Sequence, residues 1–324
     1  KLGIFQVSPN QQLLAYSSDT SGGERYTLVV KNLATGEMLA DAVPDTFYSV
    51  EWANDNRTLF YNKQNEVWRS DRVFRHTLGT DPSEDVEVFH ETDELFNVYM
   101  HKTRDDAYLV ITSASMETTE QRFLHADMPE GELTLLAPRK RGWRYFLNHR
   151  QGEFFILSNE EARNNKLMVT AVANLAPANW QTFIPHNPDK LLENVDVFAD
   201  HLVVYGRFNG LHTLDIHNFS GSIRQPVAFP EPVYAIQVSE NPEFVTDRLR
   251  FVYTSLTTAD TTVELDMDTL AWHKIKQLPV LGGYDPANYQ SERTFATAPD
   301  GTQVPISLVY RKGLVRDGRN PCLL

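Results

Sequence analysis

Apolar and polar positions alternate along the chain in short runs, and no long stretch shows the 3.6-residue period of an amphipathic helix. Within residues 7–37, the polar turn Ser8-Pro9-Asn10 is followed by a compact apolar strand at residues 13–16. An alternating strand at residues 26–32 then ends at the turn Ala34-Thr35-Gly36. Short strands bounded by turn residues are typical of a β-meander. A meander of this size cannot bury its own faces, so we expect it to pack against others.

The same layout returns five more times along the sequence. The compact strands read LLAY, TLFY, YLVI, FFIL, LVVY and RFVY, and they end at residues 16, 61, 111, 157, 205 and 253. Their spacings of 45, 50, 46, 48 and 48 residues, with about four strands in each unit, are typical of the blades of a β-propeller. Leucine-rich, ankyrin and helical repeats have other periods. An irregular β-sandwich with similar hairpins is the alternative that the pattern leaves open.

The repeat stops after the sixth unit. Residues 279–288 are rich in Gly and Pro, which indicates a linker. Residues 289–324 hold two strands around a hairpin turn, which predicts the start of a different domain that is cut short at Leu324. We therefore expect an all-β fold with a β-propeller at residues 1–278. Because the chain runs straight from Lys1 into a strand, we also expect residues upstream of it.

Composition narrows the classes of function. The 324 residues carry 30 basic and 43 acidic side chains, and the net charge of −13 disfavours nucleic acid as a partner. An acidic surface attracts cationic peptides, although the same charge can serve solubility alone. The single Cys322 excludes an internal disulfide, and no apolar run reaches the roughly 18 residues of a membrane span. With no signal-peptide layout either, we expect a cytoplasmic protein without a membrane partner.

The most basic segment of the chain contains Arg139, Lys140, Arg141 and Arg144. It can be a solvated loop, or it can contact a phosphate, an acidic partner or another part of the same molecule. We favour an intramolecular partner over nucleic acid, because only Trp143 offers a stacking surface there. The sequence holds no His-Cys cluster and no phosphate-binding loop, so we expect neither a metal nor a cofactor.

The most distinctive stretches are VSPNQQLLAYSSD, EVWRSDRVFRHTLGT, HKTRDDAYLVITSASMETTEQRFLHADMPEGE, YTSLTTADTTVELDMDTL and ANYQSERTFATAPDGTQVPISLVYRKG. They resemble the prolyl oligopeptidase family of serine peptidases, and within it the oligopeptidase B group. The resemblance implies a seven-bladed propeller over the mouth of an α/β-hydrolase domain, and cleavage of short peptides after Arg or Lys. The implied partners are that hydrolase domain, in the same polypeptide, and short basic peptides.

The chain also departs from the pattern of that family. Six blades are visible, which implies that a first blade lies upstream, and no G-x-S-x-G nucleophile motif occurs. The resemblance therefore implies that the catalytic Ser, acid and His lie beyond Leu324. On this interpretation none of the ten His residues is catalytic, and this portion alone is inactive. Residues 279–288 would link the propeller to the truncated hydrolase domain at 289–324.

For the portion present, the resemblance implies a lid that filters substrates by size. Three residues are candidates for a charged contact with the hydrolase domain or with substrate: Glu120, expected in the loop after the third meander's first hairpin, and Arg139 and Arg141. Each of them can instead be an ordinary solvated surface charge. The alternative function is a stand-alone β-propeller that binds peptides or proteins without chemistry.

Overall fold

The computed structural model describes residues 1–219 and 224–323. Residue 324, the last of the predicted hydrolase segment, lies outside the described residues. The chain divides into two compact units, Lys1–His186 and Asn187–Leu324, which are taken separately below. Among the described residues, strands are interrupted only by loops and by the short 3-10 helices η1 (Pro82–Glu84), η2 (Pro177–Asn179) and η3 (Pro286–Asn288).

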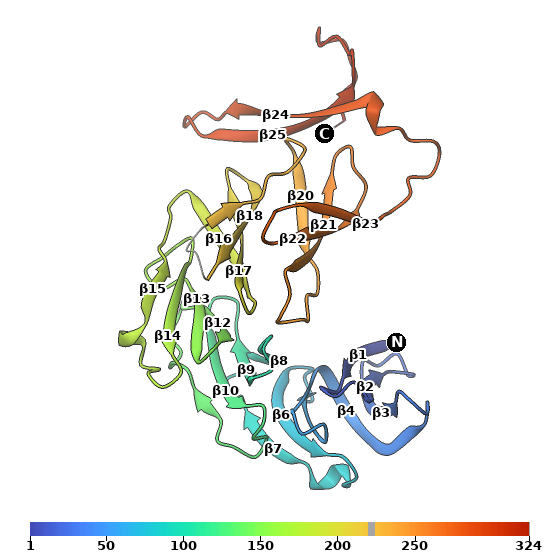
Figure 1. Cartoon of the computed structure of the whole chain (residues 1–324), viewed down its shortest axis with the longest axis vertical. Helices are drawn as coiled ribbons and strands as arrows, with labels where there is room; N and C mark the ends of the chain where they lie inside the picture. Colours follow the sequence, from blue (N-terminus) through green and yellow to red (C-terminus); the bar gives the residue numbers. More distant parts are fainter. Residues whose placement is uncertain (220–223, 324) are drawn as a thin grey trace. The chain divides into compact units, whose positions relative to one another are not determined.

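The first unit begins with a seven-stranded antiparallel sheet in sequence order (Figure 1). Its strands are β1 (Leu2–Val7), β2 (Leu13–Ser18), β3 (Tyr26–Asn32), β4 (Met38–Trp52), β5 (Thr58–Gln64), β6 (Ser70–Thr77) and β7 (Val86–His90). The 15-residue β4 serves two meanders, because Val43 pairs with Leu28 of β3 whereas Trp52 pairs with Leu59 of β5. Two repeats that are separate in the sequence pattern are therefore one sheet.

Two four-stranded sheets complete this unit. One consists of β8 (Asn97–Lys102), β9 (Tyr108–Ala114), β10 (Thr119–His125) and β11 (Thr134–Leu135). The other consists of β12 (Tyr145–Arg150), β13 (Glu153–Ser158), β14 (Lys166–Ala171) and β15 (Gln181–Ile184).

The second unit has two further four-stranded sheets and one hairpin. The first sheet is formed by β16 (Lys190–Val197), β17 (His201–Phe208), β18 (Leu211–Asn218) and β19 (Arg224–Pro226). The second is formed by β20 (Tyr234–Val238), β21 (Arg248–Ser255), β22 (Thr261–Asp266) and β23 (Trp272–Gln277). The hairpin pairs β24 (Tyr289–Thr297) with β25 (Gln303–Arg311).

The six compact strands of the sequence pattern are the second strands of six meanders, namely β2, β5, β9, β13, β17 and β21. Most residues of β5, β9, β13 and β17 are buried, as expected for strands covered on both faces, whereas burial alternates along β2 and β21. The prediction of an all-β chain of repeated four-strand meanders is confirmed. The predicted domain boundaries at residues 278 and 288 stay a prediction.

The turns that enter β2, β5 and β9 repeat one local geometry. Gln11, Asn56 and Asp106 have φ values of 59°, 58° and 58°, in the left-handed region that short polar residues tolerate best. Side-chain oxygens secure these turns; Asp55, for example, accepts hydrogen bonds from the backbone N–H groups of Arg57 and Thr58. The polar turn residues of the sequence therefore set the register of the strands they join.

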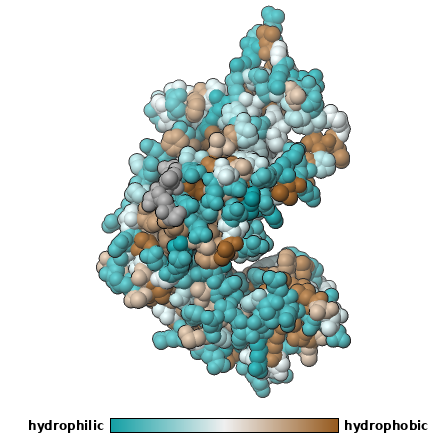
Figure 2. All heavy atoms as spheres, in the orientation of Figure 1, coloured by the Kyte–Doolittle hydropathy of each residue, from teal (hydrophilic) through white to brown (hydrophobic). Residues whose placement is uncertain are grey.

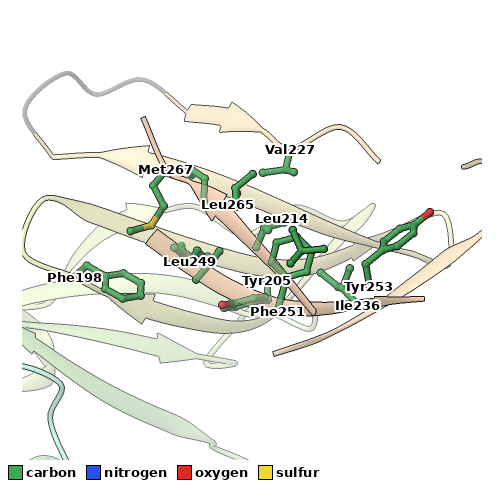
Figure 3. Close-up of a cluster of buried hydrophobic side chains, with 13 residues drawn as sticks. Phe198, Tyr205, Leu214, Val227, Ile236, Leu249, Phe251, Tyr253, Leu265 and Met267 are labelled. Atoms are coloured by element: carbon green, nitrogen blue, oxygen red, sulfur yellow. The ribbon is translucent and has the colours of Figure 1, made fainter. Parts of the chain in front are cut away.

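Successive meanders pack through shared apolar clusters. In the second unit, side chains of β17 and β18 meet those of β21 and β22, as Figure 3 shows for Tyr205, Leu214, Phe251 and Leu265. Phe251 is fully buried, and burial of a side chain of this size stabilises a fold by roughly 1.5–3 kcal/mol. Three equivalent clusters join the meanders of the first unit.

Apolar side chains that stay exposed are scattered among hydrophilic ones on the face drawn in Figure 2. Isolated exposed apolar residues of this kind are normal for a protein surface. Throughout residues 1–219 and 224–323, no helix has the length and apolar character needed to cross a bilayer.

Candidate functional site

The predicted site residues lie at one end of the β8–β11 sheet. Strand β10 begins at Thr119, directly after the turn formed by Ser115 and Thr118, and Glu120 is its second residue. The sequence-based placement of Glu120 in a loop was wrong, since its backbone is part of the ladder with β9 opposite Ser113. After β11 the chain runs back beside β10, so that the backbone N–H of Arg139 donates to the Glu120 carboxylate at 2.9 Å.

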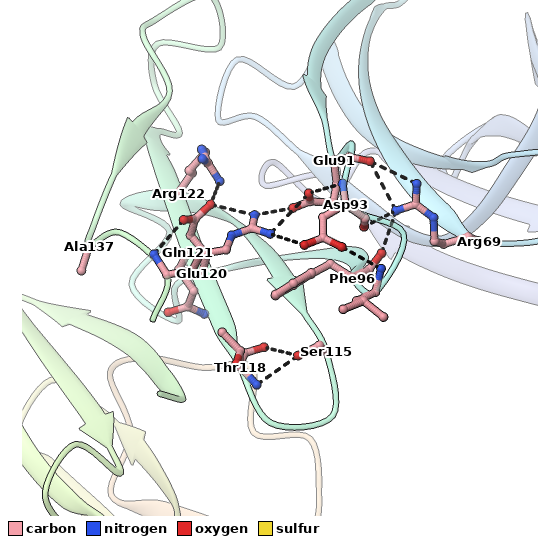
Figure 4. Close-up of polar contacts among 12 residues, drawn as sticks. Arg69, Glu91, Asp93, Phe96, Ser115, Thr118, Glu120, Gln121, Arg122 and Ala137 are labelled. Carbon is pink, nitrogen blue, oxygen red and sulfur yellow. Dashed lines mark hydrogen bonds and ion pairs between the residues drawn. The ribbon is translucent and has the colours of Figure 1, made fainter. Parts of the chain in front are cut away.

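The guanidinium of Arg139 lies between two buried carboxylates. They belong to Glu91 and Glu120, both of which Figure 4 labels. Its Nη2 is 2.5 Å from Glu91 Oε2 and 3.0 Å from Glu120 Oε1, and Glu120 also pairs with Arg122 Nη1 at 2.6 Å. The same guanidinium lies 4.1 Å from the centre of the Phe96 ring, within the range of a cation–π contact. We call these five residues the Arg139 network.

Glu91 reaches this position through the loop that follows β7. Its backbone N–H donates to the carbonyl of Asp71 at 2.8 Å, and its carboxylate accepts the N–H of Asp93. Arg69 holds the rest of the loop, because its guanidinium donates to the carbonyl oxygens of Glu91, Asp93 and Phe96 (Figure 4). The loop between β7 and β8 is therefore fixed at both ends by arginines.

The electrostatics of the Arg139 network favour full ionisation. Burial works against the charged forms of Glu91 and Glu120, but the hydrogen bonds from Arg139 outweigh it and hold the pKa of both carboxyls below the usual value. Burial likewise disfavours the charged guanidinium of Arg139, and its two carboxylate partners more than compensate, so its pKa is raised. Every charge at the centre of the network has a partner, so the cluster is suited to holding structure rather than to proton transfer.

Arg141 is not part of this network. Its side chain is 91% exposed and pairs with Glu117, itself 60% exposed, at 3.0 Å. Lys140 pairs with Glu160 at 3.3 Å, while Trp143 is buried and donates to Ser158. These pairs agree with the expected intramolecular partner for the basic segment. A role for Glu120, Arg139 or Arg141 in contacting a second domain or a substrate stays a prediction.

Sequence reasoning missed Glu91, Arg69 and Phe96. They lie 48, 70 and 43 residues before Arg139, and no motif connects them to it. The sequence did hold one signal for Arg69 and Glu91. Arg69 directly precedes β6 and Glu91 directly follows β7, and the connecting loops of each four-strand unit lie at such strand ends.

Of the histidines that contact a carboxylate, His76 and His149 have the shortest distances, and each has the composition of a partial catalytic triad. His76 is buried between Asp85, 2.6 Å from Nδ1, and Asp41, 3.1 Å from Nε2. His149 Nδ1 lies 2.5 Å from Asp105, and its Nε2 accepts a backbone N–H at 3.1 Å. Both ring nitrogens of each histidine are therefore engaged within the fold, which is the arrangement of a structural histidine. In the described part of the chain, no group of three or more His, Cys, Asp or Glu side chains could hold a metal ion.

Comparison with known proteins places these features in a family. Residues 1–277 match the family described as "Prolyl oligopeptidase, N-terminal beta-propeller domain". Dipeptidyl aminopeptidase BI of Pseudoxanthomonas mexicana is 39% identical over 99% of this chain and 44% of its own length. Protease 2 of Moraxella lacunata is 30% identical over 99% of this chain and 46% of its own length. The chain spans about half the length of the curated relatives it matches.

Solved structures agree with the sequence comparison. Oligopeptidase B from Leishmania major has a TM-score of 0.88 at 32% identity, covering 98% of this chain and 46% of that chain. The closed form of oligopeptidase B from Trypanosoma brucei with covalently bound antipain has a TM-score of 0.86 at 30% identity, with the same coverage. The meanders are thus propeller blades, and the β-sandwich alternative is excluded. The chain belongs to the prolyl oligopeptidase family, whose N-terminal β-propeller domain its residues 1–277 match.

Proposed function

We propose that this chain is the propeller of a serine oligopeptidase that cleaves short peptides after Arg or Lys. The observation that carries the proposal is the match over 98% of the chain to oligopeptidase B structures at 32% and 30% identity. The partner is an α/β-hydrolase domain of the same polypeptide, which supplies the catalytic Ser, acid and His. The propeller acts as a lid that admits short peptides and excludes folded proteins and bulk water.

The contacts of Glu120, Arg139 and Arg141 support two different roles within this lid. Glu120 pairs with Arg139, and Arg139 in turn binds Glu91 in the loop between β7 and β8, so we assign both residues to keeping the lid rigid. Arg141 and Glu117 are exposed beside them and remain able to meet a second domain or a charged peptide. Rigid loops around a lid lower the cost of reaching a closed state, because less conformational freedom is lost on closure.

The test uses the natural full-length protein that contains this chain. Chromogenic peptides of one length with Arg, Lys, Ala or Pro before the scissile bond are compared by kcat/KM. We expect the Arg and Lys peptides to be preferred by roughly a hundredfold or more. A folded protein with exposed Arg and Lys should stay intact, while the same protein after unfolding and fragmentation is cleaved. Preference for Pro would refute the assigned specificity, and no hydrolysis of any peptide would favour the stand-alone binding propeller.

A second candidate activity is the removal of dipeptides from the amino terminus. It is favoured by the 39% identity to a protein named dipeptidyl aminopeptidase BI. Mass spectrometry of the products from one peptide with a free or an acetylated amino terminus separates the two activities. An endopeptidase cleaves both forms after Arg or Lys, whereas a dipeptidyl aminopeptidase releases dipeptides from the free form and leaves the acetylated form intact.

A further inference from the structure

The linker at residues 279–288 is attached to the sheet before it at one point. Strand β23 ends at Gln277, where the match to the propeller family also ends, and the chain then runs through an exposed loop and η3 to β24 (Figure 1). Tyr284 is the one residue of this linker that is not exposed. Its side chain is therefore the natural place to look for a contact that controls the linker.

Tyr284 is held by one hydrogen bond and one ring contact. Its hydroxyl donates to the backbone carbonyl of Thr257 at 2.8 Å, and its ring stacks on Tyr289 with the centroids 5.4 Å apart. Among the described residues, this is the only hydrogen bond that joins 279–323 to the blades before them, and no ion pair joins the two parts. Arg293 also packs on the turn at Gly210, where an added Cβ would lie 3.2 Å from its Nη2.

The carbonyl that Tyr284 contacts is fixed in place. Thr257 lies in the loop between β21 and β22, and its hydroxyl donates to the carboxylate of Glu231. The hydroxyls of Thr258 and Tyr253 donate to the same carboxylate, each at 2.8 Å. Burial opposes the charged form of Glu231, but its hydroxyl donors outweigh burial and hold the pKa of this carboxyl below the usual value. An ionised acceptor strengthens these bonds, so the loop is a firm support for Tyr284.

The residues just before Tyr284 have the opposite character. Gly282 and Gly283 have φ values of 92° and 81°, and glycine can leave this region for many other conformations at little cost. A Cβ added to either residue would have no atom within 4 Å, so no neighbouring side chain confines them. The linker thus combines a pair of free glycines with one firm attachment directly after them.

We propose that Tyr284 is a latch. While its hydroxyl is bonded to the Thr257 carbonyl, the linker lies against the loop between β21 and β22. When this bond breaks, the linker turns about Gly282 and Gly283, and the segment that follows moves away from the blade. The role in catalysis rests on the proposed peptidase function, in which this motion opens the lid to substrate.

The first test is limited proteolysis of the natural full-length protein by thermolysin, which cuts before apolar residues. Val280 and Leu281 are 50% and 89% exposed, and the linker holds no Arg or Lys for the proposed peptidase activity to cut. The cleavage rate follows the population of released linker when release is fast. Tyr284→Phe removes the hydroxyl and keeps the ring, so we expect about two- to tenfold faster cleavage there, the effect of one lost hydrogen bond.

The matched control is Tyr289→Phe, which makes the same chemical change in the ring stacked on Tyr284. Within the part of the chain that the structure describes, the Tyr289 hydroxyl forms no hydrogen bond, so this variant should be cut at the natural rate. Both variants should keep the natural melting temperature, which shows that the effect of Tyr284→Phe is local to the linker.

The second test measures kcat/KM of the same proteins for two Arg peptides, one short and one several times longer. The longer peptide needs a wider opening, so we expect Tyr284→Phe to raise its kcat/KM about two- to tenfold relative to that of the short peptide. Tyr289→Phe should leave this ratio unchanged.

The latch is overturned if thermolysin cuts Tyr284→Phe and the natural protein at the same rate. It is also overturned if cleavage by thermolysin is faster but the ratio for the two peptides is unchanged, because Tyr284 would then be an anchor that does not control access. If the natural protein hydrolyses no Arg peptide, the peptidase proposal fails, and the thermolysin result alone decides whether Tyr284 holds the linker.

Discussion

The buried carboxylates of Glu91 and Glu120, in the Arg139 network, and of Asp71, at the start of β6, lie in the same compact unit and are similarly hidden from solvent. The side chains of Glu91, Glu120 and Asp71 are 4%, 7% and 4% exposed. Arg139 approaches Glu91 and Glu120 to 2.5 and 3.0 Å, whereas Arg69 and Arg72 approach Asp71 only to 3.3 and 3.8 Å, and Asp71 Oδ1 has no hydrogen bond. A completed ion network holds the fold in place, whereas a buried carboxylate oxygen without a donor subtracts from stability.

The largest expected effect is the loss of stability when the ion network around Arg139 is broken. Arg139→Ala leaves Glu91 buried with no cation and deprives Glu120 of one of two, and we expect a loss of about 3–5 kcal/mol of stability. The matched control is Arg141→Ala, two residues away, where an exposed pair should contribute less than about 1 kcal/mol. Urea unfolding of both variants measures the difference; equal losses would show that the network is not the stabilising feature.

A fourth carboxylate, Glu51 of β4, sharpens the comparison because its pKa is shifted in the opposite direction from those of Glu91 and Glu120. Burial raises its pKa to about 7, and Lys102 only partly offsets this because its ammonium also pairs with Asp106 at 3.2 Å. Since the folded-state pKa lies above the usual 4.5, stability is lost as pH rises from about 4.5 to 7. We expect Glu51→Gln to be more stable than the natural chain at pH 8, by up to about 3 kcal/mol.

Thermal unfolding at pH 8 and at pH 5 tests the Glu51 prediction. The stabilisation should shrink at pH 5, where the natural carboxyl is mostly protonated in the folded state. A gain of the same size at both pH values would indicate better packing of the amide rather than removal of a buried charge.

The smallest expected effect concerns acid. The pKa values of Glu91 and Glu120 are lowered in the folded state, so their contribution to stability is present above the usual glutamate pKa and is lost as pH falls through the folded-state value. Arg139→Gln removes the main cause of this lowering and should shift the acid unfolding midpoint to higher pH. Tryptophan fluorescence during acid titration follows this midpoint, with Arg141→Gln as the control that should not move it.

The repeated meanders could be predicted because their signal is local. Each compact strand is a short apolar run beside a polar turn. The spacing between these runs stays similar along the chain although their residues differ. The Arg139 network could not be predicted, because it depends on which side chains meet across loops tens of residues apart. The pocket that Arg25 and Asp71 both line could not be predicted for the same reason, since these residues come together only after β3, β4 and β5 have paired.

The error at Glu120 has a specific physical cause. The run from Thr118 to Arg122 is polar and resembles a loop, yet it forms the start of β10. Neighbouring strands supply hydrogen bonds to its side chains: Thr119 Oγ1 donates to the Tyr145 carbonyl, and Gln121 accepts the Leu147 N–H. Polar residues can therefore occupy a buried strand when an adjacent sheet satisfies them, which a hydrophobicity pattern alone does not register.

The unbroken strand β4 has a consequence for motion. It contributes hydrogen bonds to two meanders, so neither can open without disturbing the ladder of the other. The amide protons of β3, β4 and β5 should therefore exchange with solvent as one cooperative group. By contrast, no strand is shared across the loop between β7 and β8, where side-chain packing and the Arg139 network join the meanders instead. We therefore expect the first two blades of this chain to open together, as one cooperative unit, in native-state fluctuations.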